Sequence, residues 1–336
     1  MQELAVEVTR GGLVESRHRV ILSVVDAEGR DVIAAGDVDR FVFPRSAVKV
    51  FQAIPLIESG AADRFGLGDR ELSLCCASHS GEAGHVALAS DILSRAGLGE
   101  SDLECGCHWP FDPAVSREMA RGGAAPTQLH NNCSGKHAGF LCTAAHLGED
   151  PKAYVGAEHP VQRRVREVMG DLTGQPAGDL PMGIDGCSIP TFAAPLRSFA
   201  AGFARLVSGN GLDLARAEAG RRLMAACMAE PWMMSGTKRA CARLMEAAPG
   251  RVFAKTGAEG VFCGAVPELG VGLALKAEDG TTRAAEATVA ACLAQLFSDS
   301  DPTLSEVYGE QSRTALRNWE GIEVGEVRVV GLSAVV

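Results

Sequence analysis

The sequence predicts an α+β fold, an α/β sandwich, in which helices flank an antiparallel or mixed sheet built from both ends of the chain. Short segments rich in valine, isoleucine and leucine occur before residue 36 and again at residues 251–276, as expected for strands. Residues 61–249 between them are mainly helical in pattern. Strands that pair across such a helical insertion form one sheet from distant parts of the chain.

The N-terminal elements follow from alternation and turn residues. Alternating or continuous apolar runs predict strands, and glycine or aspartate clusters predict the turns between them. An apolar run after Pro44 predicts a helix that is kinked at Pro55 and ends near Gly60. The predicted elements in order are strands at Leu4–Val8, Val20–Val25 and Val32–Ala35, with a break at Gly11 and Gly12 and a hairpin turn at Asp26–Gly29.

The middle of the chain contains several helical patterns. The apolar segment Leu72–Ala77 reads as a strand or as a helix end, and it leads into Ser78-His79-Ser80. Polar residues at the end of an apolar segment, just before a helix, are well placed to face a cleft. The predicted helices lie at about 83–96, 138–147 and 159–170 and within 193–247, with a loop at 183–190.

The last third returns to strands. Three apolar segments at 251–255, 260–266 and 271–276 precede a turn at 278–280, an alanine-rich helix at about 284–296 and a final strand at 327–330. We expect one catalytic unit over residues 1–336. Its sheet-containing part covers about 1–60 and 250–336, and its helical part about 61–249.

Composition excludes several function classes. A formal net charge of −10 argues against nucleic-acid binding, which requires a basic face. No run is long enough to span a bilayer, and the acidic start at Met1–Leu4 lacks a signal-peptide pattern, so we expect a cytosolic protein without membrane contact. In that reducing compartment, the 11 cysteines predict no disulfide framework. Cys105-Gly-Cys107-His108 is spaced too tightly for a zinc knuckle.

One short motif suggests a nucleophile. Ser46 and Lys49 are three residues apart at the start of the predicted helix, so their side chains would stack on one face. A buried lysine has a lowered pKa and can take the proton of a serine hydroxyl. Unpaired N–H groups at the helix start would stabilise an oxyanion. Ser-x-x-Lys also occurs by chance in many chains, where both residues are simply exposed.

Further motifs reinforce this one. Ser78-His79-Ser80 and Lys255-Thr256-Gly257 follow in the order in which penicillin-binding proteins and class A β-lactamases carry Ser-x-x-Lys, Ser-Asp-Asn and Lys-Thr-Gly. The middle motif here is Ser-His-Ser and stands closer to the first. This departure argues against a β-lactam substrate but is compatible with acyl transfer by a serine with lysines moving protons.

Two cysteine-containing turns complete a resemblance to a family. Asn132-Cys133-Ser134-Gly135-Lys136-His137 and Asp185-Gly186-Cys187, together with the serine and lysine motifs, resemble the rhizobial-type L-asparaginases, the asparaginase II family. The stretch Arg10–Glu15 belongs to the same resemblance. It implies a β-lactamase/glutaminase-like fold, hydrolysis of the side-chain amide of L-asparagine to L-aspartate and ammonia, and a homodimer.

The resemblance also implies site residues. Ser46 would be the nucleophile with Lys49 as its base, and Ser78 would form a second pair with Lys255. Cys133, Lys136 and Cys187 would hold a zinc ion, a donor set in which two thiolates suit the metal. Candidate substrate-binding residues are Arg45, His137 and Asp185, and Thr256 and Glu259 are further candidates beside the late lysine.

Several alternatives stay open at this point. Another serine amidohydrolase, either a glutaminase or a penicillin-recognising enzyme, fits the same motifs. So does a zinc-stabilised binding protein without catalysis. The sequence does not decide between asparagine and glutamine, between Ser46 and Ser78 as the acylated residue, or whether the zinc ion is needed for turnover or only positions substrate or structure.

Overall fold

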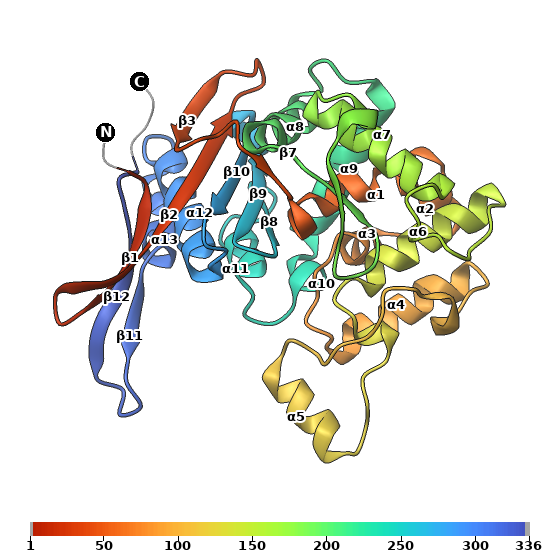
Figure 1. Cartoon of the computed structure of the whole chain (residues 1–336), viewed down its shortest axis with the longest axis horizontal. Helices are drawn as coiled ribbons and strands as arrows, with labels where there is room; N and C mark the ends of the chain where they lie inside the picture. Colours follow the sequence, from red (N-terminus) through yellow and green to blue (C-terminus); the bar gives the residue numbers. More distant parts are fainter. Residues whose placement is uncertain (1–2, 333–336) are drawn as a thin grey trace.

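The computed structural model describes residues 3–332. Met1, Gln2 and residues 333–336, the two ends of the predicted catalytic unit, lie outside the described residues. Figure 1 shows a sheet-containing part formed by both ends of the chain beside a mainly helical part formed by its middle. The predicted α+β class, with one sheet from N- and C-terminal strands, is confirmed. Within the described residues, no helix is both long and apolar enough to cross a bilayer.

The main sheet has eight strands and is antiparallel throughout. Its order is β11-β12-β1-β2-β10-β9-β8, and β3 also pairs with β2. The long strand β2 connects two halves, because its first residues pair with β1 while its last residues pair with β10 and β3. The strands are β1 (Ala5–Arg10), β2 (Leu13–Val25), β3 (Asp31–Ala35), β8 (Phe253–Gly257), β9 (Val261–Val266), β10 (Val271–Ala277), β11 (Thr314–Arg317) and β12 (Glu323–Val330).

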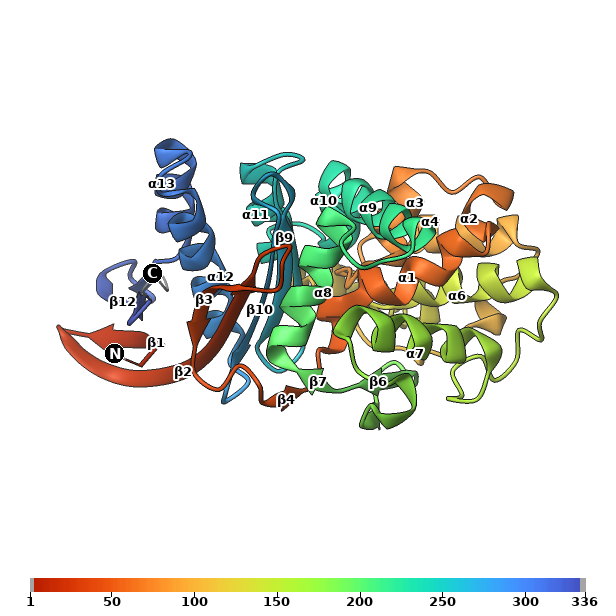
Figure 2. The ribbon, with the colours of Figure 1, turned by 90° about the horizontal axis from the view of Figure 1, so that it is seen from above.

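Helices cover both faces of strands β8 to β10. Figure 2 shows α12 and α13 on one side of these strands, and α8 with the helical part on the other. Helix α8 approaches β10 closely, because a Cβ atom on Gly272 would lie 2.1 Å from the carbonyl oxygen of Ala200. The helices that cover the sheet are α8 (Leu196–Ser208), α12 (Thr282–Phe297) and α13 (Pro302–Gln311).

The helical part holds the remaining helices and two small antiparallel sheets. Both sheets, β4 with β7 and β5 with β6, have two strands; β4 and β7 lie near the sheet-containing part, and β6 lies beside α7. The strands are β4 (Phe41–Val42), β5 (Met182–Ile184), β6 (Pro190–Phe192) and β7 (Ala194–Pro195). The helices are α1 (Lys49–Glu58), α2 (Ala61–Arg64), α3 (Asp69–Cys75), α4 (Ala83–Arg95), α5 (Pro113–Arg121), α6 (Ser134–Leu147), α7 (Pro160–Thr173), α9 (Leu214–Ala229), α10 (Pro231–Ser235) and α11 (Ala240–Ala247).

The apolar segment before Ser78 is the end of helix α3, one of the two alternatives that its pattern left open, and its apolar residues pack against neighbouring helices. Other local predictions need correction. Strand β2 begins at Leu13, directly after the glycine turn, although its first residues are exposed and give no apolar run. Helix α6 begins at Ser134, four residues before its predicted start. The mostly exposed strand β11 has no apolar pattern that predicts it.

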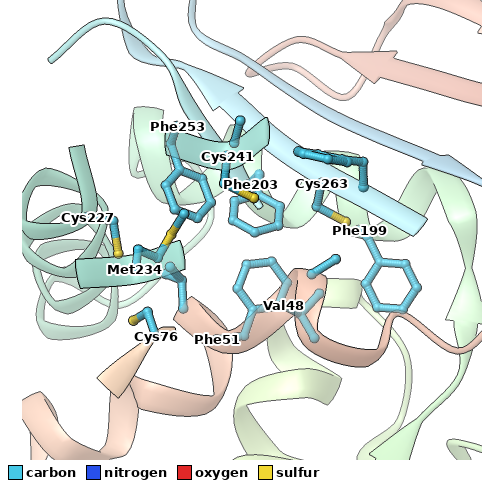
Figure 3. Close-up of a cluster of buried hydrophobic side chains, with 14 of the residues drawn as sticks. Val48, Phe51, Cys76, Phe199, Phe203, Cys227, Met234, Cys241, Phe253 and Cys263 are labelled. Atoms are coloured by element: carbon cyan, nitrogen blue, oxygen red, sulfur yellow. The ribbon is translucent and has the colours of Figure 1, made fainter. Parts of the chain in front are cut away.

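An aromatic cluster joins the two parts of the chain. Figure 3 shows Phe51 of α1, Phe199 and Phe203 of α8 and Phe253 of β8 in one buried group with several sulfur-containing side chains. The ring of Phe203 lies 4.5 Å from that of Phe51 and 5.6 Å from that of Phe253 between centroids. The cluster therefore fixes the start of α1 against β8, two elements that are far apart in sequence.

Candidate active site

Ser46 lies in a short 3-10 turn, η1 (Arg45–Val48), and not in an α-helix. Arg45 has a φ of 52°, a left-handed conformation that is strained for a residue with a side chain and is frequent at functional sites. The first hydrogen bond within the turn is donated by the Ala47 N–H to the Pro44 carbonyl at 3.1 Å. Ser46 itself is half-buried.

Lys49 is the first residue of α1, and its amine does not bond Ser46 as the helical spacing predicted. Among the described residues, it donates to the Ala77 carbonyl, to Ser78 Oγ at 3.1 Å and to Cys133 Sγ at 3.1 Å. The difference arises from the partners of the amine, because three acceptors outside the turn hold it in place. Lys49 is fully buried in spite of its charge.

Ser78 is the point at which the two predicted lysines meet. Lys255 Nζ donates to Ser78 Oγ at 2.9 Å, so this hydroxyl contacts both amines. The Ser78 backbone is held by a hydrogen bond to the Met234 carbonyl at 3.0 Å. Ser78 and Lys255 are both buried, and burial of such a polar group is tolerated only where hydrogen bonds compensate for lost water.

Gly257 allows β8 to approach the Ser46 turn. A Cβ atom at this position would lie 2.6 Å from the Pro44 carbonyl oxygen and 3.2 Å from the Ala47 nitrogen. Any larger residue would therefore separate the strand that carries Lys255 from the turn that carries Ser46. This contact gives a physical reason for the glycine in Lys255-Thr256-Gly257.

The two predicted thiols also converge here. Cys133 caps the start of α6, Cys187 lies in the loop after β5, and each thiol shifts the pKa of the other. Lys136 Nζ lies 3.0 Å from Cys187 Sγ. A continuous chain of polar contacts thus runs from Lys255 through Ser78, Lys49, Cys133 and Cys187 to Lys136.

Burial and neighbouring charges tune these groups. Burial, reinforced by the positive charge of Lys49, lowers the pKa of Lys255 from 10.5 to about 8. The hydrogen bond from Cys187 and the charges of Lys49 and Lys136 lower the pKa of the Cys133 thiol well below its ordinary value, against the effect of burial. The pair therefore carries a thiolate that balances the surrounding ammonium groups.

The three predicted substrate-binding residues lie around these polar contacts. Arg45 forms an ion pair with Asp185, with Nε 2.7 Å from Oδ1, and thereby ties the Ser46 turn to the loop that carries Cys187. His137 is fully buried beside Lys136, and its Nδ1 lies 2.7 Å from the Tyr154 hydroxyl. The Nε2 atom of His137 is buried without a hydrogen-bond partner among the described residues.

A cavity of about 420 Å³ opens onto both serines. The motifs contain some of its walls, Asn132 among them, but not Phe111, Arg239, Ala258 and Thr282, which come from loops and element ends that have no recognisable pattern. The lining residues are Ser46, Ser78, Phe111, Asn132, Arg239, Thr256, Gly257, Ala258 and Thr282.

The donor set at the thiols fits a zinc ion. Two sulfur atoms and one amine, all buried and in mutual contact, supply three ligands and leave a fourth position open. The described residues contain no group of three histidine, cysteine, aspartate or glutamate side chains arranged to hold a metal. A site built here therefore depends on the Lys136 amine, which must lose its proton to coordinate, whereas the neighbouring Cys187 and Cys133 raise its pKa against the effect of burial.

Comparison with known proteins gives one family match. Residues 6–329 match the family described as L-asparaginase II. No curated protein gives a significant match. Three similar solved structures are one described as Mglu in its native form (16% identity, TM-score 0.46, 86% of this chain and 66% of that chain), a β-lactamase from Mycobacterium bovis (14%, 0.39, 87% and 94%) and a β-lactamase from Burkholderia ambifaria (13%, 0.34, 77% and 83%). This chain thus spans slightly less than two thirds of the first of these.

Proposed function

This chain belongs to the L-asparaginase II family, and we propose that it is an amidohydrolase that hydrolyses the side-chain amide of L-asparagine to L-aspartate and ammonia through a serine acyl-enzyme. The observation that carries the proposal is the contact of two buried lysine amines with Ser78, in the wall of a cavity that also exposes Ser46. Nucleophile, proton acceptor and space for a small substrate are then in one place.

In the first step, Ser46 Oγ attacks the amide carbon of the substrate. The Ser46 N–H precedes the first N–H group that donates a hydrogen bond within the turn. It is our candidate donor to the developing oxyanion. Ser46 is the more exposed of the two serines, so it is the more accessible to a substrate carbonyl. Contacts between catalytic groups often tighten only once substrate is bound.

We assign the role of proton acceptor to Lys255, acting through the Ser78 hydroxyl. Its lowered pKa, about 8, leaves a usable neutral fraction near pH 7. Lys49 donates to three acceptors and therefore serves as a charged anchor for Ser78 in this arrangement. Direct proton transfer from Ser46 to Lys49, as the spacing suggested, stays a prediction.

The second step returns the enzyme to its starting state. The proton on Lys255 passes to the departing nitrogen, and the C–N bond breaks. Ammonia departs, and the substrate stays attached to Ser46 as an ester. A water molecule then attacks this ester while the neutral Lys255 accepts a proton. Lys255 returns this proton to the Ser46 oxygen as the ester is cleaved, which releases L-aspartate and restores both the Ser46 hydroxyl and the neutral amine.

Cys133, Lys136 and Cys187 would hold the proposed zinc ion. When bound, the ion would supply positive charge that neutralises the thiolates and would fix the start of α6 against the loop after β5. The Arg45–Asp185 pair orients the Ser46 turn toward this loop. We also propose that Arg45, Asp185 and His137 bind the substrate. A homodimer and a cytosolic location are further proposals.

Ammonia release from L-asparagine and L-glutamine by the purified chain tests the proposed function. We expect asparagine to be preferred and Ser46→Ala to abolish turnover with an unchanged thermal melt. Ser94→Ala, which removes an exposed hydroxyl on α4, is the matched control. Near-normal ammonia release by Ser46→Ala refutes the role of Ser46, preference for glutamine favours a glutaminase, and acylation by a β-lactam favours a penicillin-recognising enzyme. An unreactive serine in a chain that retains zinc favours a binding protein.

A further inference from the structure

Arg239 is the one charged residue among those that line the cavity of Ser46 and Ser78. It precedes α11 and follows Lys238, whose φ of 60° lies in the left-handed region. Its backbone N–H donates to the Gly236 carbonyl at 3.4 Å, and its carbonyl accepts from the Arg243 N–H at 3.1 Å. The side chain is half-buried and so is partly shielded from bulk solvent.

The guanidinium of Arg239 has no carboxylate partner. Among residues 3–332, no aspartate or glutamate oxygen lies within 4.0 Å of it, although many other arginines in the chain are paired. The positive charge of Arg239 acts to lower the pKa of Glu286, but the two side chains form no ion pair. Arg45, the arginine that the sequence suggested as a carboxylate ligand, is already bonded to Asp185. The cavity therefore contains an uncompensated cation, and the predicted carboxylate ligand is occupied.

Aromatic packing holds Arg239 in the cavity wall. Its guanidinium carbon lies 5.9 Å from the centroid of the Phe111 ring, a cation–π distance. The Phe111 ring stacks on His108 at 4.6 Å, and His108 Nε2 accepts a hydrogen bond from the Asn132 backbone N–H at 2.9 Å. Asn132 also lines the cavity. These contacts link Arg239 to the segment that carries Cys133 and leave its N–H groups available to a ligand.

Resting on the proposed function, we propose that Arg239 binds the α-carboxylate of the substrate and makes the enzyme selective for amides that carry a free carboxylate. Arginine is suited to this task because its planar guanidinium can donate two parallel hydrogen bonds to one carboxylate. In L-asparagine the amide carbon and the carboxylate carbon are separated by three C–C bonds, about 4 Å at most with standard bond lengths. A cation in the same small cavity as Ser46 therefore suits both ends of this molecule.

The substrate scope follows from this assignment. Succinamate, which has the carboxylate but lacks the amine, should be hydrolysed. 3-Aminopropanamide, which lacks the carboxylate, should be a poor substrate, and so should asparagine whose α-carboxyl group is blocked as an amide. Loss of the carboxylate leaves a half-buried cation without a partner, and sites built to pair a polar group reject ligands that lack it.

The test compares Arg239→Gln, Arg239→Lys and the control Arg243→Gln, which removes an exposed charge one turn along α11. For L-asparagine and succinamate, we expect Arg239→Gln to raise KM roughly 10- to 100-fold with kcat within a few-fold, as for loss of a charge-assisted hydrogen bond. Arg239→Lys should recover part of the loss. Hydrolysis of 3-aminopropanamide, already slow, should be unchanged in all three variants.

Three kinetic results overturn the inference: an unchanged KM for L-asparagine in Arg239→Gln, an equal loss with 3-aminopropanamide, or the same effect in Arg243→Gln. Calorimetric titration of L-aspartate separates this inference from the proposed function. If the wild-type chain releases no ammonia, the proposed function fails. The carboxylate site still stands if L-aspartate binds to wild type and Arg243→Gln but not to Arg239→Gln. Equal binding to all three, or no binding to wild type, refutes it.

Discussion

The pH dependence of turnover follows from the burial of Lys255. With a pKa of about 8, roughly one tenth of the amine is neutral at pH 7, whereas a lysine at 10.5 would be neutral in about 0.03% of molecules. This is a difference of roughly 300-fold in the concentration of competent base. We therefore expect kcat/KM for L-asparagine to rise about tenfold per pH unit below pH 8 and to level off above it.

The groups around Lys255 determine this value. Burial and the charges of Lys49 and Arg239 lower the pKa, and the thiols of Cys241 and Cys133 act in the opposite direction. The groups that face the amine from the elements packed against it are Lys49 on α1, Cys133 before α6, Cys227 on α9, Arg239 and Cys241 at α11, and Cys263 on β9.

The assay is initial ammonia release from pH 5.5 to 10, with a thermal melt at each pH to exclude unfolding. Lys255→Arg, which keeps the charge but cannot become neutral, should lower kcat/KM by at least about 100-fold, the contribution typical of general-base catalysis. A flat profile, an apparent pKa near 10.5, or a Lys255→Arg variant with the wild-type profile would show that this amine is not the proton acceptor.

The same burial predicts an effect on stability with a definite sign. Folding disfavours the protonated amine, so the penalty is absent above pH 10.5, grows as the pH falls toward 8 and is constant below that. The difference between the two pKa values corresponds to about 3 kcal/mol. Lys255→Met should therefore be inactive but at least as stable as the wild type at pH 7. Its gain in the free energy of unfolding should be at most this amount, reduced by the contribution of the lost hydrogen bonds. A strongly destabilised Lys255→Met contradicts the reasoning.

Three further predictions concern the neighbouring structure. Gly257→Ala places a Cβ atom 2.6 Å from the Pro44 carbonyl oxygen, so kcat should fall at least about 100-fold, while Gly309→Ala, at an open position in α13, should not change it. Cys187→Ser should lower bound zinc, measured by atomic emission after dialysis, about tenfold or more, and an unchanged content would rule out this ligand. Phe203→Ala should cost about 3–5 kcal/mol in denaturant unfolding, and a loss below 1 kcal/mol would show that the aromatic cluster does not join the two parts.

Elements with a strong local pattern were predictable from the sequence. The central strands β9 and β10 are buried throughout, which produces continuous apolar runs, and α12 repeats alanine over its length. Strand β11 and the first residues of β2 are mostly exposed, so nothing in their composition distinguishes them from loops. Their pairing is a property of the folded sheet.

The candidate site shows the same division. The serine, lysine and cysteine residues of the motifs could be identified because reactive residue types occur there at characteristic short spacings. The structure brings these residues together. The spacing of Ser46 and Lys49 fitted a helix, but the acceptors that hold the Lys49 amine, Ser78 among them, come from segments distant in the sequence and could not be read from the motif. Arg239 stands in no motif, and its relation to the cavity depends on tertiary contacts with Phe111.

The position of the site between the two parts of the chain follows from the chemistry proposed for it. An amine can act as a base near neutral pH only if it is removed from water, yet a buried amine needs partners that hold it in place. Strand β8 supplies Lys255 and α1 supplies Lys49, and the aromatic cluster fixes these elements against each other. Lys255 belongs to the sheet-containing part and donates to Ser78 of the helical part, so its place in the site depends on the contact between the two parts. Loosening this contact should therefore raise the pKa of Lys255 toward 10.5 and shift the pH profile before the protein unfolds.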